Sequence, residues 1–234
     1  MGAVWDDPRV QRGMRAQLEL RRRTLEEGAE RLGWKVAFGS AQVREALGID
    51  APLTGFLTTQ SVVAPGATYS IAGWTKPALE PEIAVHMGRD LGAGATREET
   101  EAAIAALAPA IELADLDRPL EELEAILAEN IFQRAVILGE PDPDRAGGSA
   151  EGLSARVFTN GSEVAATEDP EGFAGDVVEI VRHVAELLAA FGESLRAGDV
   201  VITGAVVPHV WPSSGDHVAY ELVPLGRIDV TLAA

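Results

Sequence analysis

Two glutamates, Glu80 and Glu82, stand two positions apart in a stretch whose side chains alternate in polarity. Its apolar residues all fall on one face: Leu79, Pro81, Ile83, Val85 and Met87. This alternation predicts a half-buried β-strand, which would project both carboxylates from its other face. Two like charges that close repel each other unless one is protonated or a cation lies between them. A divalent cation with oxygen ligands is one interpretation of the pair, and a solvated polar face is the other.

A third carboxylate, that of Glu112, lies in the apolar run of residues 110–115. Its neighbours predict a buried strand, where a carboxylate must be neutral, hydrogen-bonded or bound to a cation unless it faces water. Three carboxylates on rigid strands would leave half of an octahedron open, which suits Mg2+ or Mn2+. A 2-oxo acid could fill two of the open positions with its carboxylate and keto oxygens, and the cation would act as a Lewis acid.

Only two of the 19 basic residues, Lys35 and Lys76, are lysines. Lys35 lies between Trp34 and Val36 in a short apolar stretch that predicts a strand over residues 33–40. An ammonium group in such surroundings is partly buried and needs an anionic partner. Lys35 is therefore a candidate for chemistry, with retention on the surface as the alternative, whereas we expect Lys76 to be a surface residue.

The composition excludes several classes of protein. The chain has 234 residues, of which 47% are hydrophobic, enough for a substantial core. Its formal net charge of -18 repels nucleic acids and anionic membranes, so we expect neither as a partner. The lack of cysteine excludes disulfides, thiolate chemistry and sulfur-bound zinc. We expect a cytoplasmic protein, because no signal-peptide pattern and no apolar run of membrane-spanning length is present.

The elements that must position these side chains are short. Apolar stripes and capping signals predict helices over residues 7–32, 41–47, 96–107 (ended by Pro109), 119–129 and 176–191. Alternating or apolar runs predict further strands over residues 61–63, 68–71, 134–138, 155–159, 162–166, 217–222 and 228–232, and a buried strand that ends at Thr203-Gly204. Many short strands with a few helices predict an α+β or mostly-β fold.

The motifs resemble those of the 2-keto-4-pentenoate hydratase and 4-oxalocrotonate decarboxylase group of the fumarylacetoacetate hydrolase superfamily. The resemblance extends over nearly the whole chain. It rests on the order and spacing of Gly33-Trp34-Lys35, Gly55-Phe56-Leu57-Thr58, Glu80-Pro81-Glu82-Ile83-Ala84, Pro109-Ala110-Ile111-Glu112, Glu129-Asn130, Asn160-Gly161, Gly198-Asp199-Val200-Val201-Ile202-Thr203-Gly204 and Gly215-Asp216. No single motif is decisive, but together they are fairly specific.

The resemblance implies an α+β fold, a mixed β-roll of the fumarylacetoacetate hydrolase C-terminal type with flanking helices. Residues 1–75 would form an N-terminal helical segment with small strands, and residues 76–234 the β-roll catalytic domain. The alternative is one continuous domain over residues 1–234. The resemblance also implies a homo-oligomer built from dimers.

The site residues that the resemblance implies include those singled out above. Glu80, Glu82 and Glu112 would hold Mg2+ or Mn2+ as the cofactor. Lys35 matches the family's catalytic lysine, which can pair with a substrate carboxylate or move a proton. The substrate, a small 2-oxo acid or its dienol, would be bound by Lys35, Thr58, Thr203 and Gly204.

The implied activity is that of a metal-dependent lyase acting on a short 2-oxo acid in the catabolism of aromatic compounds. A hydratase like those for 2-keto-4-pentenoate is the first expectation, and a decarboxylase is the second. An acylpyruvate hydrolase and a non-catalytic hydratase-like binding partner are the further alternatives. Two departures leave the proton-transfer step open: Thr58-Thr59-Gln60 stands where an acidic residue is common, and Ile131-Phe132 stands where small polar residues are usual.

Overall fold

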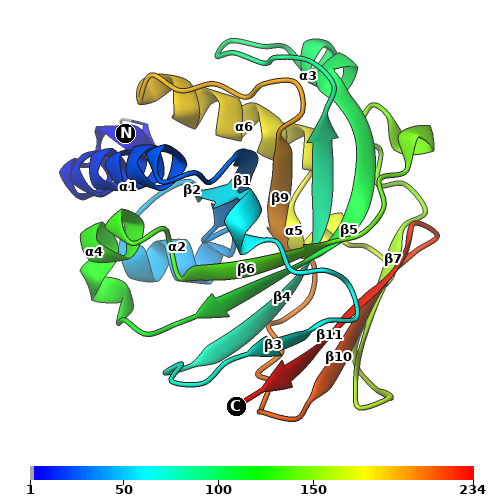
Figure 1. The fold of residues 1–234 in the computed structure, drawn as a ribbon. Helices are drawn as coiled ribbons and strands as arrows, with labels where there is room; N and C mark the ends of the chain where they lie inside the picture. The colour runs from blue at the N-terminus through cyan, green and yellow to red at the C-terminus, as the bar shows by residue number, and fades with distance from the viewer. Residues whose placement is uncertain (1–2) are drawn as a thin grey trace.

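The computed structural model describes residues 3–234, which fold into two β-sheets flanked by helices (Figure 1). The α-helices are α1 (Pro8–Glu26), α2 (Ala41–Leu47), α3 (Arg97–Ala103), α4 (Leu123–Ala128), α5 (Glu171–Ala174) and α6 (Val177–Ala190). The strands are β1 (Arg31–Ala37), β2 (Leu53–Thr58), β3 (Thr68–Ser70), β4 (Pro77–Met87), β5 (Ile104–Asp115), β6 (Gln133–Leu138), β7 (Ser154–Thr159), β8 (Ser162–Thr167), β9 (Val200–Ala205), β10 (His217–Val223) and β11 (Gly226–Ala233). Short 3-10 helices cover Val4–Asp6, Thr59–Ser61, Leu120–Glu122 and Pro143–Arg145.

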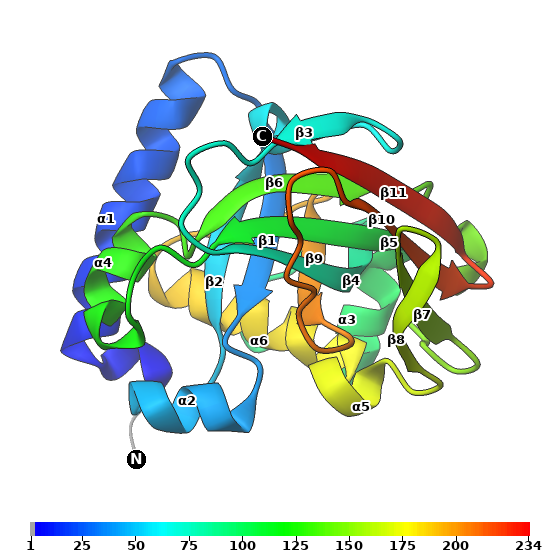
Figure 2. The same cartoon turned by 90° about the horizontal axis from the view of Figure 1, so that it is seen from below.

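The larger sheet has six strands in the order β2-β1-β9-β4-β5-β6, and the smaller has five in the order β3-β11-β10-β7-β8. Both are mixed, because β1 runs parallel to β9 and β3 runs parallel to β11. Figures 1 and 2 show α1, α4 and α6 on one side of the molecule and the smaller sheet on the other. The main core lies between the sheets, where Leu79, Ile83 and Val85 of β4 meet Val218 and Tyr220 of β10.

The six-stranded sheet curls until its two edges meet. The chain leaving β2 returns to β6, where Val62 forms a bridge with Val136 and the Val63 N–H donates to the Val136 carbonyl at 2.9 Å. The inside of this roll is filled largely by small and branched side chains: Leu57, Ala84, Ala108, Ala110, Val136, Val200 and Ile202. Small residues are needed there because opposite walls of a narrow roll approach one another closely.

This curl corrects the expectation that β4 is half-buried. Its apolar face packs in the main core as predicted, but Glu82 and Ala84 on the other face have no exposed surface either. The face that the alternation assigns to solvent is the inside of the roll. Pairing between residue 62 and residue 136 closes the roll, and such a long-range contact leaves no mark in the period of a single strand.

Most predicted elements are present, but three differ from the expectation. The helix expected over residues 7–32 ends at Glu26, and β1 begins at Arg31. The helix expected over residues 96–107 ends at Ala103, and Pro109 lies within β5. That segment is buried on both faces, which favours a strand over an alanine-rich helix. Residues 61–63 form a turn and a single bridge instead of a strand. The capping box of Thr96 and Glu99 and the hairpin between β7 and β8 are confirmed.

Strands from both sides of residue 75 share the six-stranded sheet, since β1 and β2 pair alongside β9 and β4. This arrangement favours one continuous domain over a division at that residue. None of the described helices combines the length and apolar character needed to cross a membrane.

Gly33 marks the closest approach of two strands in this sheet. A Cβ placed on it would lie 1.9 Å from the Val200 carbonyl oxygen of β9, well inside van der Waals contact. Because that neighbour is backbone in a parallel pair, it cannot move without shifting the strand. Gly33 therefore lets β1 seat against β9 and brings Lys35, two residues along, to its position in the sheet.

We expect Gly33→Ala to lower the free energy of unfolding by about 3 kcal/mol or more, because the new methyl group overlaps fixed backbone atoms. Urea denaturation of the purified variant measures this. Gly92→Ala is the matched control, since nothing lies within 4 Å of its added Cβ, and we expect it to change stability by less than about 0.5 kcal/mol. Equal stability of the two variants would contradict this account of the strand packing.

Candidate metal centre

Three carboxylates converge because of the register between β4 and β5. In this antiparallel pair Glu80 lies directly opposite Glu112, and Glu82 projects from the same face two residues along. One carboxylate oxygen of each residue lies within 4.8 Å of the others. Glu82 and Glu112 have no exposed surface, whereas Glu80 is partly exposed. The structure therefore brings together the three glutamates that the sequence analysis selected.

The end of β9 supplies a donor to this cluster. The Gly204 N–H donates to Glu82 Oε2 at 2.6 Å, and Gly204 has a φ of 91° that favours glycine. The ladder between β4 and β9 shifts register at this point, which aims the amide at the carboxylate. Beside it, the buried Thr203 hydroxyl donates to the Ile83 carbonyl at 3.2 Å. Both residues thus adjoin the cluster, and their expected contact with a substrate stays a prediction.

Lys35 reaches the cluster from β1. Its Nζ lies 2.8 Å from Glu112 Oε1, and it donates to the Ile131 carbonyl at 2.7 Å. Gly55 stands directly opposite on β2, and a Cβ there would lie 3.1 Å from the lysine side chain. The absence of a side chain at Gly55 therefore makes room for the extended ammonium arm. The anionic partner that the sequence predicted for Lys35 is Glu112.

Asn130 holds the turn that carries this carbonyl. Its side chain accepts from the Phe56 N–H at 2.8 Å and donates to the Phe56 carbonyl at 2.9 Å, joining the end of α4 to β2. Asn130, Ile131 and Phe132 all have positive φ, at 68°, 50° and 63°. Such a run is strained outside glycine and persists only where surrounding contacts enforce it. The sequence analysis gave Asn130 no role, although asparagine tolerates this conformation well.

Burial and mutual repulsion dominate the electrostatics of the cluster. Burial, followed by the charges of Glu112 and Glu80, raises the pKa of Glu82 well above its usual value. Burial also raises the pKa of Glu112, and the Lys35 ammonium opposes this. Glu82 Oε1 and both Glu112 oxygens have no well-directed hydrogen bond from residues 3–234. Clustered oxygen donors with spare lone pairs fit a hard divalent cation such as Mg2+, Mn2+ or Ca2+.

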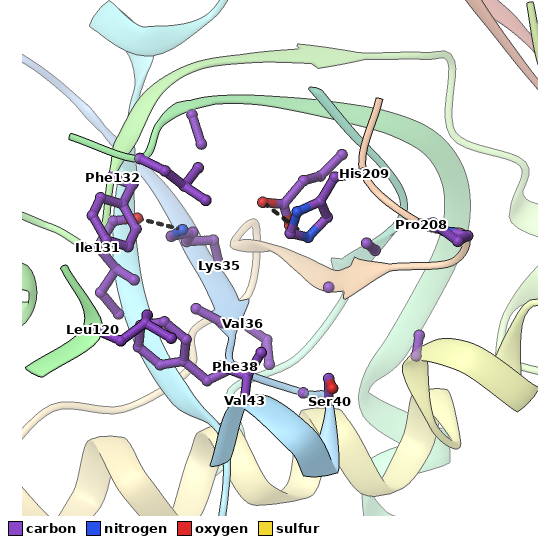
Figure 3. A pocket seen from close by; sticks show the side chains of 18 of the residues that line it. Lys35, Val36, Phe38, Ser40, Val43, Leu120, Ile131, Phe132, Pro208 and His209 are labelled. Atoms are coloured by element: carbon purple, nitrogen blue, oxygen red, sulfur yellow. Dashed lines mark hydrogen bonds and ion pairs between the residues drawn. The ribbon is translucent and has the colours of Figure 1, made fainter. Parts of the chain in front are cut away.

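A cavity of about 610 Å³ opens above the cluster, with Lys35, Glu80, Thr203 and Gly204 on its wall (Figure 3). Glu82 and Glu112 lie behind this wall, so the cluster meets the cavity through Glu80 and Lys35. The cavity gives the three carboxylates an opening toward a small molecule.

Two residues that the sequence analysis left without a role also line the cavity. His209 Nε2 lies 3.6 Å from Glu80 Oε1, and Figure 3 shows the His209 ring at the cavity. Lys76, expected on the surface, is exposed but stands over the Trp211 ring at 4.6 Å from its centroid. No local pattern marks either residue, because the loop after β9 carries His209 and Trp211 to the cavity, where Trp211 meets Lys76 from just before β4.

Thr58, which we expected to bind substrate, lies away from the cavity. It pairs with Arg31, three residues beyond the Gly55–Lys35 pair, which carries it roughly 10 Å along the strand. Thr58 does not line the cavity, so its position argues against contact with a substrate. A likeness of motif placed it at the site, but the direction of β2 leads away from it.

The fold and the site together define the class of protein. Residues 33–233 match the family described as fumarylacetoacetate (FAA) hydrolase C-terminal, and the chain belongs to this family. The expected family and the expected mixed β-roll fold are thereby confirmed.

Within this family, the chain is similar to proteins named as hydratases and decarboxylases. A 2-hydroxyhexa-2,4-dienoate hydratase of Comamonas testosteroni is 29% identical over 89% of this chain and 81% of its own. A 4-oxalocrotonate decarboxylase of Pseudomonas sp is 28% identical over 87% of this chain and 79% of its own. The structure of 4-oxalocrotonate decarboxylase from Pseudomonas putida G7, complexed with magnesium and adipate, has the same fold, with a TM-score of 0.87 at 24% identity over 99% of this chain and 90% of that one.

Without metal, Glu82 should make the protein less stable as pH rises. Its pKa is higher in the folded than in the unfolded chain, so the folded state keeps a proton that the unfolded state has lost. The stability from this group is complete below the unfolded pKa and is lost as pH rises through the folded one. We therefore compare the free energy of unfolding of Glu82→Gln with that of the wild type, by urea denaturation in EDTA. We expect this difference to shift in favour of the variant by about 1–3 kcal/mol from pH 5 to pH 8.

The exposed Glu121 provides the matched control for this experiment. Glu121→Gln removes the same charge from the surface, and we expect its stability relative to the wild type to be the same at both pH values. If the free energies of unfolding of Glu82→Gln and Glu121→Gln change with pH in parallel, the buried carboxylate is not the source of the effect.

Proposed function

We propose that this protein is a divalent-metal-dependent lyase that acts on a small 2-oxo acid, with hydration as its first candidate reaction. The observation that carries the proposal is the convergence of Glu80, Glu82 and Glu112 beside Lys35, at the wall of a cavity, in a member of this family. Relatives named as hydratases of 2-hydroxyhexa-2,4-dienoate and 2-keto-4-pentenoate support it. Two relatives named 4-oxalocrotonate decarboxylase favour decarboxylation as the second candidate.

In this proposal Glu80, Glu82 and Glu112 hold Mg2+ or Mn2+. When bound, the cation supplies Lewis acidity and a template for the carboxylate and keto oxygens of a 2-oxo acid. Glu82 Oε1 and Glu112 Oε2 are buried and accept no hydrogen bond from residues 3–234, which supports this assignment. The decarboxylase of Pseudomonas putida G7, which shares this fold, is complexed with magnesium, in keeping with the same assignment.

Lys35 is the residue that we assign to catalysis. Its ammonium borders the cavity, and Glu112 and the Ile131 carbonyl fix its position at 2.8 and 2.7 Å. From there it can pair with the substrate carboxylate or deliver a proton to the carbon chain. A fixed donor avoids the cost of ordering a flexible lysine during the reaction.

Thr203 and Gly204 form the adjoining wall and complete the proposed substrate site. Their polar groups are engaged with β4, since the Thr203 hydroxyl donates to Ile83 and the Gly204 amide to Glu82. We therefore assign them to shaping the site and holding Glu82, with substrate contact through the backbone that lines the cavity. The family resemblance also leads us to propose a cytoplasmic homo-oligomer built from dimers that works in the catabolism of aromatic compounds.

Titration of the purified protein with Mn2+ by calorimetry tests the metal site. We expect one site per chain, and we expect Glu82→Gln to weaken binding at least about 100-fold because it removes a charged ligand. Glu121→Gln should bind as the wild type does. Binding of metal without turnover of any 2-oxo acid would favour a non-catalytic partner, and no metal binding would remove the enzyme proposal.

Lys35→Met tests the catalytic assignment. We expect turnover to fall at least about 100-fold, because a positioned proton donor contributes that much or more, while Mn2+ binding and the fold are retained. The substrates are a panel of 2-oxo-4-enoates and 2-oxo diacids with Mg2+, followed by ultraviolet absorbance and CO2 release, which also separates hydration from decarboxylation. Unchanged kinetics would reduce Lys35 to a structural role.

A further inference from the structure

The cavity is much larger than the polar head of a 2-oxo acid requires. Its volume of about 610 Å³ lies in the range that holds drug-sized ligands. A pyruvoyl group bound beside Lys35 and Glu80 would occupy only the polar end. The rest of the cavity must therefore receive another part of the substrate or be filled by water.

An apolar wall lines the remainder. Phe38, Val43, Leu120, Ile131 and Phe132 come from four separate segments of the chain and gather on the same side of the cavity as Lys35 (Figure 3). The backs of these side chains belong to the second hydrophobic core, formed around α1 and α4. The wall is thus preformed, since each residue is held from behind by packed neighbours.

The mouth of the cavity is apolar as well. Phe173 of α5 and Trp211 of the loop after β9 both line it, and they are 49% and 51% exposed. Half-exposed aromatic side chains at a rim cost free energy in water unless something apolar covers them. They extend the apolar wall from the interior to the surface.

Of the two cationic residues near this end of the cavity, Arg118 is already paired with carboxylates. Arg118 forms ion pairs with Glu122 at 2.9 Å and Glu129 at 2.6 Å, so its charge is compensated. Lys76 is exposed and stands over the ring of Trp211. A second carboxylate at Arg118 would have to compete with Glu122 and Glu129, whereas an apolar group would meet a wall that is already formed by packed side chains.

We propose, on the basis of the function proposed above, that the natural 2-oxo acid carries an apolar tail of at least phenyl size, which packs on the wall of Phe38, Val43, Leu120 and Phe132 and beneath Phe173. The polar head selects the 2-oxo acid, and this wall selects the tail. The same cavity then discriminates against 2-oxo diacids.

Three unreactive compounds that share one head group test this: 2-oxobutanoate, 4-phenyl-2-oxobutanoate and 2-oxohexanedioate. Their affinities for the Mn2+-loaded full-length protein are measured by calorimetry. We expect the phenyl compound to bind at least about tenfold more tightly than 2-oxobutanoate, from the apolar area it buries. 4-Phenylbutanoate, which lacks the keto group, should bind far more weakly than its 2-oxo counterpart.

Phe173→Ala and Leu120→Ala should each lower the preference for the phenyl compound over 2-oxobutanoate by about 3- to 10-fold. Phe173 is half exposed, so its truncation tests the wall even if Leu120→Ala fails to fold. Val164→Ala is the control, because Val164 is 52% exposed on β8 and lies outside the cavity. That variant should keep the wild-type preference.

Several outcomes would overturn the proposal. Equal binding of 2-oxobutanoate and its phenyl derivative would show that the tail lies elsewhere, with the metal and head-group site intact. Tighter binding of 2-oxohexanedioate would assign this end to a second carboxylate. If Phe173→Ala changes the oligomeric state but not the preference for the phenyl compound, the aromatic rim of the cavity packs against a second copy of the chain instead of a substrate tail. No metal-dependent binding of any 2-oxo acid would instead overturn the proposed function and this inference with it.

Discussion

The burial of Glu82 and Glu112 beside Glu80 is the constraint on which the rest of the structure depends. Carboxylates removed from water and held within 4.8 Å of one another repel strongly, and each loses its hydration. Lys35 supplies one compensating charge and the Gly204 amide one donor, which leaves Glu82 Oε1 and Glu112 Oε2 without a donor in the described part of the chain. Burying this acidic cluster therefore lowers the stability of the fold. A divalent cation bound between the carboxylates would relieve their repulsion.

Holding like charges together requires a rigid backbone. The pairing of β4 with β5 extends over eleven residues on β4, from Pro77 to Met87, with one irregularity at the end far from the cluster. On the same face as the glutamates, alanines at positions 84, 108 and 110 let the sheet curl until residues 62 and 136 meet. A carboxylate in a closed roll cannot swing out to water, so the repulsion remains unless a proton or a cation relieves it.

The sequence was informative where chemistry followed a local rule. The period of two placed Glu80 and Glu82 on one face, and an apolar run marked Glu112 as an unusual carboxylate. It was uninformative where distant segments meet. Closure of the roll buried the supposed polar face of β4, and the direction of β2 carried Thr58 away from the site. Asn130 and His209 act through contacts with Phe56 and Glu80 that lie far away in the chain, so no spacing could reveal them.

The turn formed by Asn130, Ile131 and Phe132 joins the two ends of the cavity in one strained segment. The backbone carbonyl of Ile131 accepts a hydrogen bond from the Lys35 ammonium, while the side chains of Ile131 and Phe132 form part of the apolar wall. Its three positive φ angles are held by the Asn130 amide, which is anchored to both backbone groups of Phe56. Small polar residues in this turn could accept the lysine but could not build the wall. Bulky apolar residues in this turn thus leave the ammonium in place and form the wall beside it.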